Sequence, residues 1–190
     1  MANEVLQKEG TSFIFADVSY APGAAAVNNL GVHEAASDID LASLAFGAAR
    51  QSTKKDLGAT RARQIAVTAC IEIAGDPLAG ETVDFYWGGS KEVTAGMGNP
   101  GNLTGTDAAY AGYTASSLAE GLAKLLYIGS LPLSIMNTAD AEFDMAFIGV
   151  FSPTHRYGSL VVVNSATADN LHSDSVEMAV QFMPIVDEVQ

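Results

Sequence analysis

Residues 64–73 read QIAVTACIEI, and every second side chain in this segment is apolar. One face carries Ile65, Val67, Ala69, Ile71 and Ile73, whereas the other is polar or small. A period of two places alternate side chains on opposite faces of an extended chain. The segment therefore predicts a β-strand with one face in a hydrophobic core.

The next segment, residues 82–87, repeats the pattern. Val83, Phe85 and Trp87 alternate with Asp84 and Tyr86, after a connection that contains the strand breakers of residues 75–80. A short connection rich in glycine and proline is typical of neighbouring antiparallel strands. We expect these two strands to form an antiparallel pair or to be neighbours in a sandwich.

Further strands are expected towards the C-terminus. Residues 143–151 place Phe143, Met145, Phe147 and Phe151 on one parity, and Gly149 interrupts this face as a bulge would. Residues 160–163 are almost entirely apolar, which predicts a strand buried on both faces or at an interface. The last alternating segment is residues 176–182, and we expect the following proline to end it. Weaker candidates are residues 12–18, 44–50 and 127–133.

One short helix is expected among the strands. Ser117 and Glu120 have the spacing of a capping box, and Leu118, Leu122, Leu125 and Leu126 then form one stripe, which predicts two to three turns. Residues 88–113 and 21–29 are instead long segments rich in glycine and alanine, with little periodicity. We expect residues 88–113, or the N-terminal residues 1–12, to be ordered only when docked on a neighbour.

These segments predict one mainly β domain that spans residues 1–190. Seven or eight strands without βαβ alternation favour an antiparallel β-sandwich, either plain or jelly-roll-like, with one short helix and long loops. No linker or change in composition divides the chain. Residues 1–12 are expected to form an extended N-terminal arm.

Charge excludes two classes of partner. The net charge is −13, and charged residues make up only 16% of the 190 residues. This balance opposes binding to nucleic acid or to an anionic membrane surface. The N-terminus lacks the layout of a signal peptide, so we expect synthesis in a cytoplasm without export by a recognisable signal.

No pattern in the sequence indicates catalysis, a cofactor or a metal. Residues 96–101 match G-x-G-x-x-G, but proline at the fifth position and the absence of a following helix favour a loop. Asp38 with Asp40, and the acidic residues near Asp174, are read as solvated loops rather than calcium ligands. The three histidines lie far apart, and the single cysteine, Cys70, is read as a small residue of a strand. We predict a protein that is not an enzyme.

Basic residues are gathered in one region of this acidic chain. Five of the nine lie within fourteen positions: Arg50, Lys54, Lys55, Arg61 and Arg63. They form either a solvated loop or a positive patch that docks on an acidic partner. A second candidate contact is His155, Arg156 and Tyr157, since arginine and tyrosine are preferred interface anchors.

Three segments resemble virion structural proteins of tailed bacteriophages. They are PLAGETVDFYW at residues 77–87, FSPTHRYGSLVVVN at residues 151–164 and VDEVQ at residues 186–190. Within that class, the chain is most similar to a capsid decoration (cement) protein.

The resemblance implies a β-rich module on the exterior of the capsid that stabilises the shell by bridging major capsid subunits. It also implies self-association, as a dimer or trimer, on the shell. The alternative from another class is a tail or fibre module that binds a receptor or a carbohydrate. That module would need exposed aromatic residues, for which Tyr86, Trp87, Tyr110 and Tyr113 are the candidate set.

Overall fold

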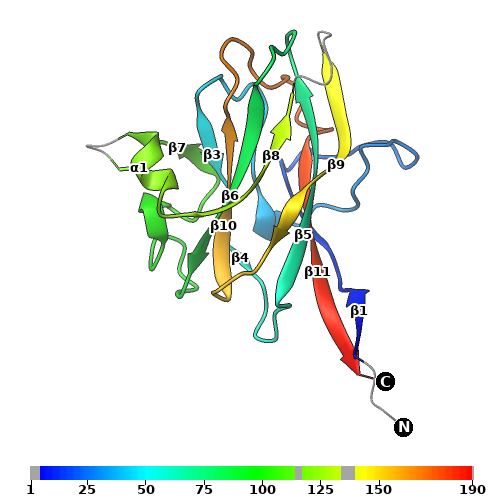
Figure 1. Ribbon diagram of the computed structural model, residues 1–190, viewed down its shortest axis with the longest axis vertical. Coiled ribbons are helices and arrows are strands. Elements are labelled where there is room, and N and C mark those ends of the chain that lie inside the picture. The colour runs from blue at the N-terminus through cyan, green and yellow to red at the C-terminus, as the bar shows by residue number, and fades with distance from the viewer. Residues whose placement is uncertain (1–4, 114–116, 134–139, 190) are drawn as a thin grey trace.

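The computed structural model describes residues 5–113, 117–133 and 140–189, which form two antiparallel β-sheets packed face to face (Figure 1). The strands are β1 (Val5–Glu9), β2 (Phe13–Ala16), β3 (Ala49–Gln51), β4 (Lys55–Asp56), β5 (Gln64–Ile73), β6 (Thr82–Ser90), β7 (Ala108–Tyr110), β8 (Leu126–Pro132), β9 (Ala141–Phe151), β10 (Tyr157–Asn164) and β11 (Ala179–Val189). Sheet A has the order β1-β11-β5-β9, with β2 also paired to β11. Sheet B has the order β7-β3-β10-β6-β8, with β4 also paired to β10.

The strands pair in a nested order. β2 pairs with β11, β3 with β10, β5 with β9, and β6 with β8. Four nested pairs divided between two facing sheets form the topology of the eight-stranded jelly roll. The predicted antiparallel sandwich is confirmed, and its connectivity is that of the jelly-roll alternative.

The core lies between the predicted faces of β5 and β6. Val67 and Ile73 on β5 and Phe85 on β6 are completely buried. The two strands belong to different sheets, so they are neighbours across the sandwich and not an antiparallel pair. The connection of residues 74–81 therefore carries the chain from one sheet to the other.

Trp87 is the largest side chain of the core. Its ring centroid lies 5.6 Å from that of Phe151, 5.5 Å from that of Phe182 and 6.3 Å from that of Phe15. These three phenylalanines come from sheet A, whereas the tryptophan comes from sheet B. Aromatic contacts at these distances bury large apolar areas, so this cluster joins the two sheets.

Strand β9 departs from the predicted parity. Its register against β5 shifts at two places, and Met145 adopts a positive φ of 48°. Phe143 and Phe151 remain buried, but Met145 and Phe147 are 58% and 66% exposed, while Ile148 is turned into the core. Irregularities that add a residue invert the alternation beyond them, so the inward positions predicted for Met145 and Phe147 were wrong.

Strand β11 continues through Pro184, contrary to the prediction that this residue ends it. Pro184 lies opposite Ile65, and its carbonyl oxygen accepts a hydrogen bond from the Gly10 amide at 2.7 Å. Beyond Ile185 β11 pairs with β1 alone, so the two strands form a ribbon that projects from the domain (Figure 1). Residues 5–9 of the expected N-terminal arm form one strand of this ribbon.

Helix α1 (Leu118–Leu122) is shorter than predicted. Leu118, Leu122 and Leu125 pack on sheet B as the stripe predicts, but Leu126 is exposed and belongs to β8. The Ser117 side chain makes no capping hydrogen bond, so the predicted capping box is absent here. The helix packs on the outer face of sheet B beside its edge strand β7 (Figure 1).

Two glycines bring the sheets together along one edge. A Cβ atom on Gly129 of β8 would lie 2.3 Å from the Ile148 carbonyl oxygen of β9, and one on Gly149 would lie 2.8 Å from the Ile128 carbonyl oxygen. The backbones can approach this closely only because neither residue has a side chain. This contact closes one side of the sandwich.

Candidate protein-interaction site

The fold uses three of the five predicted basic residues internally. Arg50 donates from Nε and Nη2 to Asp107 at 2.6 and 2.7 Å, an arrangement that raises the pKa of Arg50. Lys55 is buried, with Nζ 2.7 Å from Glu34 Oε2. The hydrogen bond from Lys55 lowers the pKa of Glu34. Neither cation is available to a partner.

Lys54 holds a loop instead of a partner. Its Nζ donates to the Ser90 hydroxyl and to the carbonyl oxygens of Glu92, Thr94 and Met97, at distances of 2.7–3.1 Å. Burial lowers the pKa of Lys54. The ammonium group therefore fastens residues 90–97, which the sequence indicated to be part of an unstructured segment.

We expect Lys54→Met to open this loop, because the methionine removes the ammonium group that donates to all four oxygen atoms. The free energy of unfolding should fall by about 2–3 kcal/mol, and trypsin should cleave faster after Lys91. Urea unfolding and limited proteolysis measure the two effects. Lys124→Met is the matched control, since Lys124 is exposed on the turn after α1. Equal cleavage of both variants would contradict this role.

The remaining predicted residues meet at one end of the sandwich. Arg61 donates from Nη2 to the Thr154 carbonyl oxygen at 3.0 Å, which joins the loop before β5 to the loop between β9 and β10. We call Arg61, Arg63, His155 and Arg156 the basic end; the loops that carry it, before β5 and between β9 and β10, lie at the lower end of the domain in Figure 1. The sequence indicated two separate contacts, and the structure places them side by side.

The cations of the basic end differ in their availability. Arg156 donates to both carboxylate oxygens of Asp56 at 2.7–2.8 Å, which lowers the pKa of Asp56, and its guanidinium lies 5.1 Å from the Tyr157 ring centroid. Arg63 has no ion pair or hydrogen bond to any described side chain. It lines three adjoining shallow depressions with Ser152 and Ile185 among their other residues. Arg63 is therefore the most accessible cation of this end.

An acidic cluster occupies the opposite end of sheet A. We call Glu72, Glu142, Asp144 and Glu177 the acid end, since all four line one small depression. Burial raises the pKa of Glu72, and the charges of Glu142 and Glu177 raise it further, although His172, 3.1 Å away, opposes them. Among the described residues, no group of histidine, cysteine, aspartate or glutamate side chains is arranged to hold a metal ion.

The raised pKa of Glu72 predicts a pH-dependent effect. Because the folded state binds this proton more tightly than the unfolded state does, ionisation of Glu72 opposes folding at neutral pH. We expect Glu72→Gln to raise the melting temperature at pH 7 and to leave it unchanged at pH 3, where the carboxyl is protonated in both states. Thermal unfolding followed by circular dichroism at both pH values measures the difference. A lower melting temperature at pH 7 would contradict the prediction.

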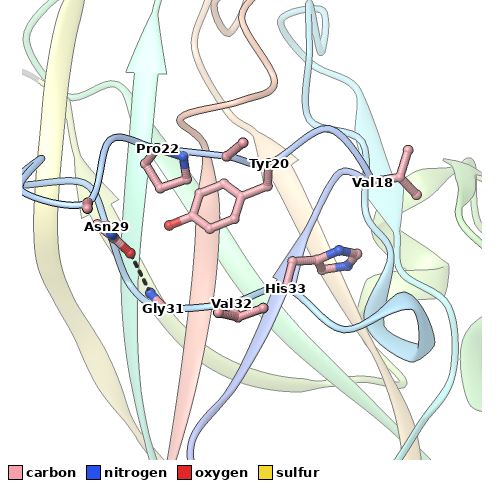
Figure 2. A pocket seen from close by; sticks show the side chains of 9 residues that line it. Val18, Tyr20, Pro22, Asn29, Gly31, Val32 and His33 are labelled. Carbon is pink, nitrogen blue, oxygen red and sulfur yellow. Dashed lines mark hydrogen bonds between the residues drawn. The ribbon is translucent and has the colours of Figure 1, made fainter.

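A further depression lies under the loop that follows β2. Tyr20, Pro22, Asn29, Val32 and His33 line it, and Figure 2 shows the Tyr20 ring at its centre, with Asn29 accepting a hydrogen bond from the Gly31 amide at 3.0 Å. The Tyr20 hydroxyl is already engaged, since it donates to the Asn28 carbonyl oxygen and accepts from the Leu30 amide. The depression is open, and its polar groups serve the loop itself.

The fold encloses three residues that the sequence offered as candidates for reactivity or sugar binding. Cys70 is buried beneath Tyr20 and Leu30, and burial raises the pKa of its thiol to about 11, so it is not a thiolate at neutral pH. Trp87 is only 2% exposed and Tyr110 is also buried, so neither can line an exposed groove. Tyr127, which is 51% exposed, was not in the candidate set.

No family model, curated protein or solved structure matches this chain. Among the described residues, no helix has the length and apolar character needed to cross a membrane. The surfaces of the domain, above all the basic end, are therefore the features that bear on its function.

Proposed function

We propose that this chain is a structural protein of a tailed-bacteriophage virion, which binds the assembled capsid and stabilises it by bridging major capsid subunits. The observation that carries this proposal is the basic end, where three arginines and His155 gather on a chain whose net charge is −13. Opposite charges on the two partners would orient such a protein before contact.

Two further features support the proposal. The segment 151–164, which resembles phage virion proteins, supplies His155 and Arg156 to the basic end. The jelly roll is a fold of many viral capsid domains, although it also occurs in lectins, so the fold alone favours neither candidate function. Bridging subunits requires contact area and several attachment points rather than reactive groups.

The test is binding to undecorated phage shells. We expect the protein to cosediment with intact shells to a saturating ratio and to raise their melting temperature, and we expect added salt to weaken binding. Arg156→Glu and Arg61→Glu should each weaken binding about three- to fivefold. Lys124→Glu makes the same change of charge away from the basic end and should bind as the wild type does.

Two results would reject the proposal. One is the absence of both cosedimentation and stabilisation with shells that are shown to be intact. The other is equal binding by the Arg156→Glu and Lys124→Glu variants, which would mean that the basic end does not face the shell.

The alternative, a tail or fibre module that binds a carbohydrate, rests on one observation. Tyr86 and Tyr127 lie with ring centroids 5.3 Å apart on the outer face of sheet B. The neighbouring Asp84 accepts hydrogen bonds from Thr82, Ser130 and Ser165, so its oxygens are already engaged. Glycan-array binding that Tyr127→Ala abolishes would favour this alternative over the capsid.

A further inference from the structure

The outer face of sheet A is covered over only part of its area. Tyr20 and Leu30, from the loop after β2, pack on Ile14, Ala16, Cys70 and Ala179. Further along the strands a set of apolar side chains lies uncovered or partly covered. We call this set the apolar face: Ala66 on β5, Met145, Phe147 and Val150 on β9, and Met183 on β11.

The register of the strands places these residues side by side. Phe147 lies opposite Thr68, which in turn lies opposite Gln181, and Val150 lies opposite Ala66, which lies opposite Met183. The strand segments 66–68, 145–150 and 179–183 contain no charged residue. An uncharged surface with an exposed phenylalanine and methionine at its centre has the composition of an interface core.

Strand β9 turns these residues outward through its two irregularities. Continuous alternation would have placed Met145 and Phe147 in the core with Phe143. The register shifts and the positive φ of Met145 instead place both side chains on the outer face. A positive φ is unfavourable for a residue with a side chain, and such features recur at functional sites.

Opposite charges lie at the two ends of the apolar face. The acid end is at one end of β5, where Glu72 pairs with Glu142 of β9. Arg63 immediately precedes the other end of β5, where it lines a depression with Ser152, Ile185 and Asp187. Glu72 lies nine positions after Arg63 along the extended strand, a span of roughly 30 Å. The face is therefore apolar at its centre and acidic at one end, and at its other end it presents Arg63 beside a single carboxylate, Asp187.

We infer that a second copy of this chain covers the apolar face in a twofold symmetric dimer. When the twofold axis crosses the face near Phe147, the strands of the two copies run in opposite directions. The acid end of each copy then lies over Arg63 of the other, and the apolar centres meet. A surface of this kind is complementary to itself, as a twofold interface requires.

The dimer is expected to be weak in solution. Three strands spaced about 4.8 Å apart, and about six residues long, give a face on the order of 14 by 20 Å. This is below the ~800 Å² that each partner of a standard interface buries. We therefore expect a reversible dimer at micromolar to millimolar concentration, which repeated attachment to a larger assembly would strengthen.

Sedimentation velocity without any shells tests this inference, over a range from about 10 µM to 1 mM. We expect the weight-average sedimentation coefficient of the wild type to rise with concentration towards that of a dimer. Phe147→Asp should weaken dimerisation by at least about tenfold. Phe46→Asp is the matched control, because Phe46 is 51% exposed but lies in the turn before β3, away from the apolar face. Circular dichroism should show that both variants are folded.

A mixing experiment tests the orientation of the two copies. Arg63→Glu and Asp144→Lys should each weaken self-association about three- to tenfold, because each places like charges together at both ends of the dimer. An equimolar mixture of the two variants should associate more strongly than either variant alone. In the mixed dimer both ends again join opposite charges.

Three results would overturn the inference. The wild type could remain monomeric at 1 mM, or Phe147→Asp could associate like the wild type. The mixture could also associate no better than its components, which would reject the proposed orientation. If the wild type stayed monomeric and the Phe147→Asp variant lost its binding to shells, the apolar face would instead be assigned to a capsid partner. The inference does not depend on the proposed function, since no shell is present in the sedimentation experiments.

Discussion

Trp87→Ala is expected to lower the free energy of unfolding by about 3–5 kcal/mol, because it removes the largest side chain of the core. The indole contacts Phe151 and Phe182 from across the sandwich, so its loss leaves a cavity between the two sheets. The surrounding rings belong to separate strands that the sheets hold in place, and they cannot collapse fully into the space. Urea unfolding followed by circular dichroism measures the loss.

Phe147→Ala is the control for Trp87→Ala. It also truncates an aromatic residue, but this residue is 66% exposed, so the change should be within about 0.5 kcal/mol at monomeric concentrations. A loss of less than 1 kcal/mol for Trp87→Ala would mean that the indole does not join the sheets. Urea unfolding of Trp87→Ala also bears on the carbohydrate-binding alternative. If this variant is unfolded, its loss of carbohydrate binding would not show that Trp87 contacts a sugar.

Gly129→Ala is expected to cost about 2–3 kcal/mol, although it adds only one methyl group. The new Cβ would meet the Ile148 carbonyl oxygen at 2.3 Å, so the backbones of β8 and β9 must separate. That separation opens the closed side of the sandwich and exposes Ile128 and Ile148, which are buried there. Thermal unfolding should show a lower melting temperature.

Gly96→Ala provides the comparison for Gly129→Ala. A Cβ at residue 96 would have no atom within 4 Å, so the same change of sequence should be nearly neutral. If the two variants were equally stable, the close approach of β8 and β9 would not be a requirement of the fold.

The alternation of apolar residues was sufficient to predict the strands and the sandwich. Along β5 and β6 every predicted inward residue is buried, because the register shifts place their extra residues on the partner strands β9 and β8. The sheet order could not be predicted, because antiparallel neighbours and facing strands have the same alternation. The nested pairing depends on contacts between segments that are far apart in the sequence.

In strand β9 the alternation of residues did not predict correctly which side chains face the core. Its apolar residues occupy both faces, so their identity does not reveal where the register shifts. The shifts depend on how β9 fits against β5, which no local pattern reports. Met145 and Phe147 were therefore predicted to be in the core, although they form the centre of the apolar face.

The candidate site was predicted in part. The concentration of basic residues was evident in the sequence, but the partners of Arg50, Lys54 and Lys55 come from segments between 21 and 57 residues away. Such pairings are set by the fold, so the sequence could not distinguish a cation that binds its own chain from one that is free. The proximity of Arg61 to His155 and Arg156 arises because two loops meet at one end of the sandwich.

The nested order of the strands also governs how the domain is made. Strand β11 lies between β2 and β5, yet it is the last of the eight jelly-roll strands to leave the ribosome. Until residues 179–189 emerge, sheet A lacks its middle strand, and the apolar faces of β2 and β5 have no partner there. Pairing between such distant segments is slow compared with local folding. The nascent chain therefore exposes unpaired, aggregation-prone strand edges until β11 has been made. We expect chaperones to be most needed at this stage.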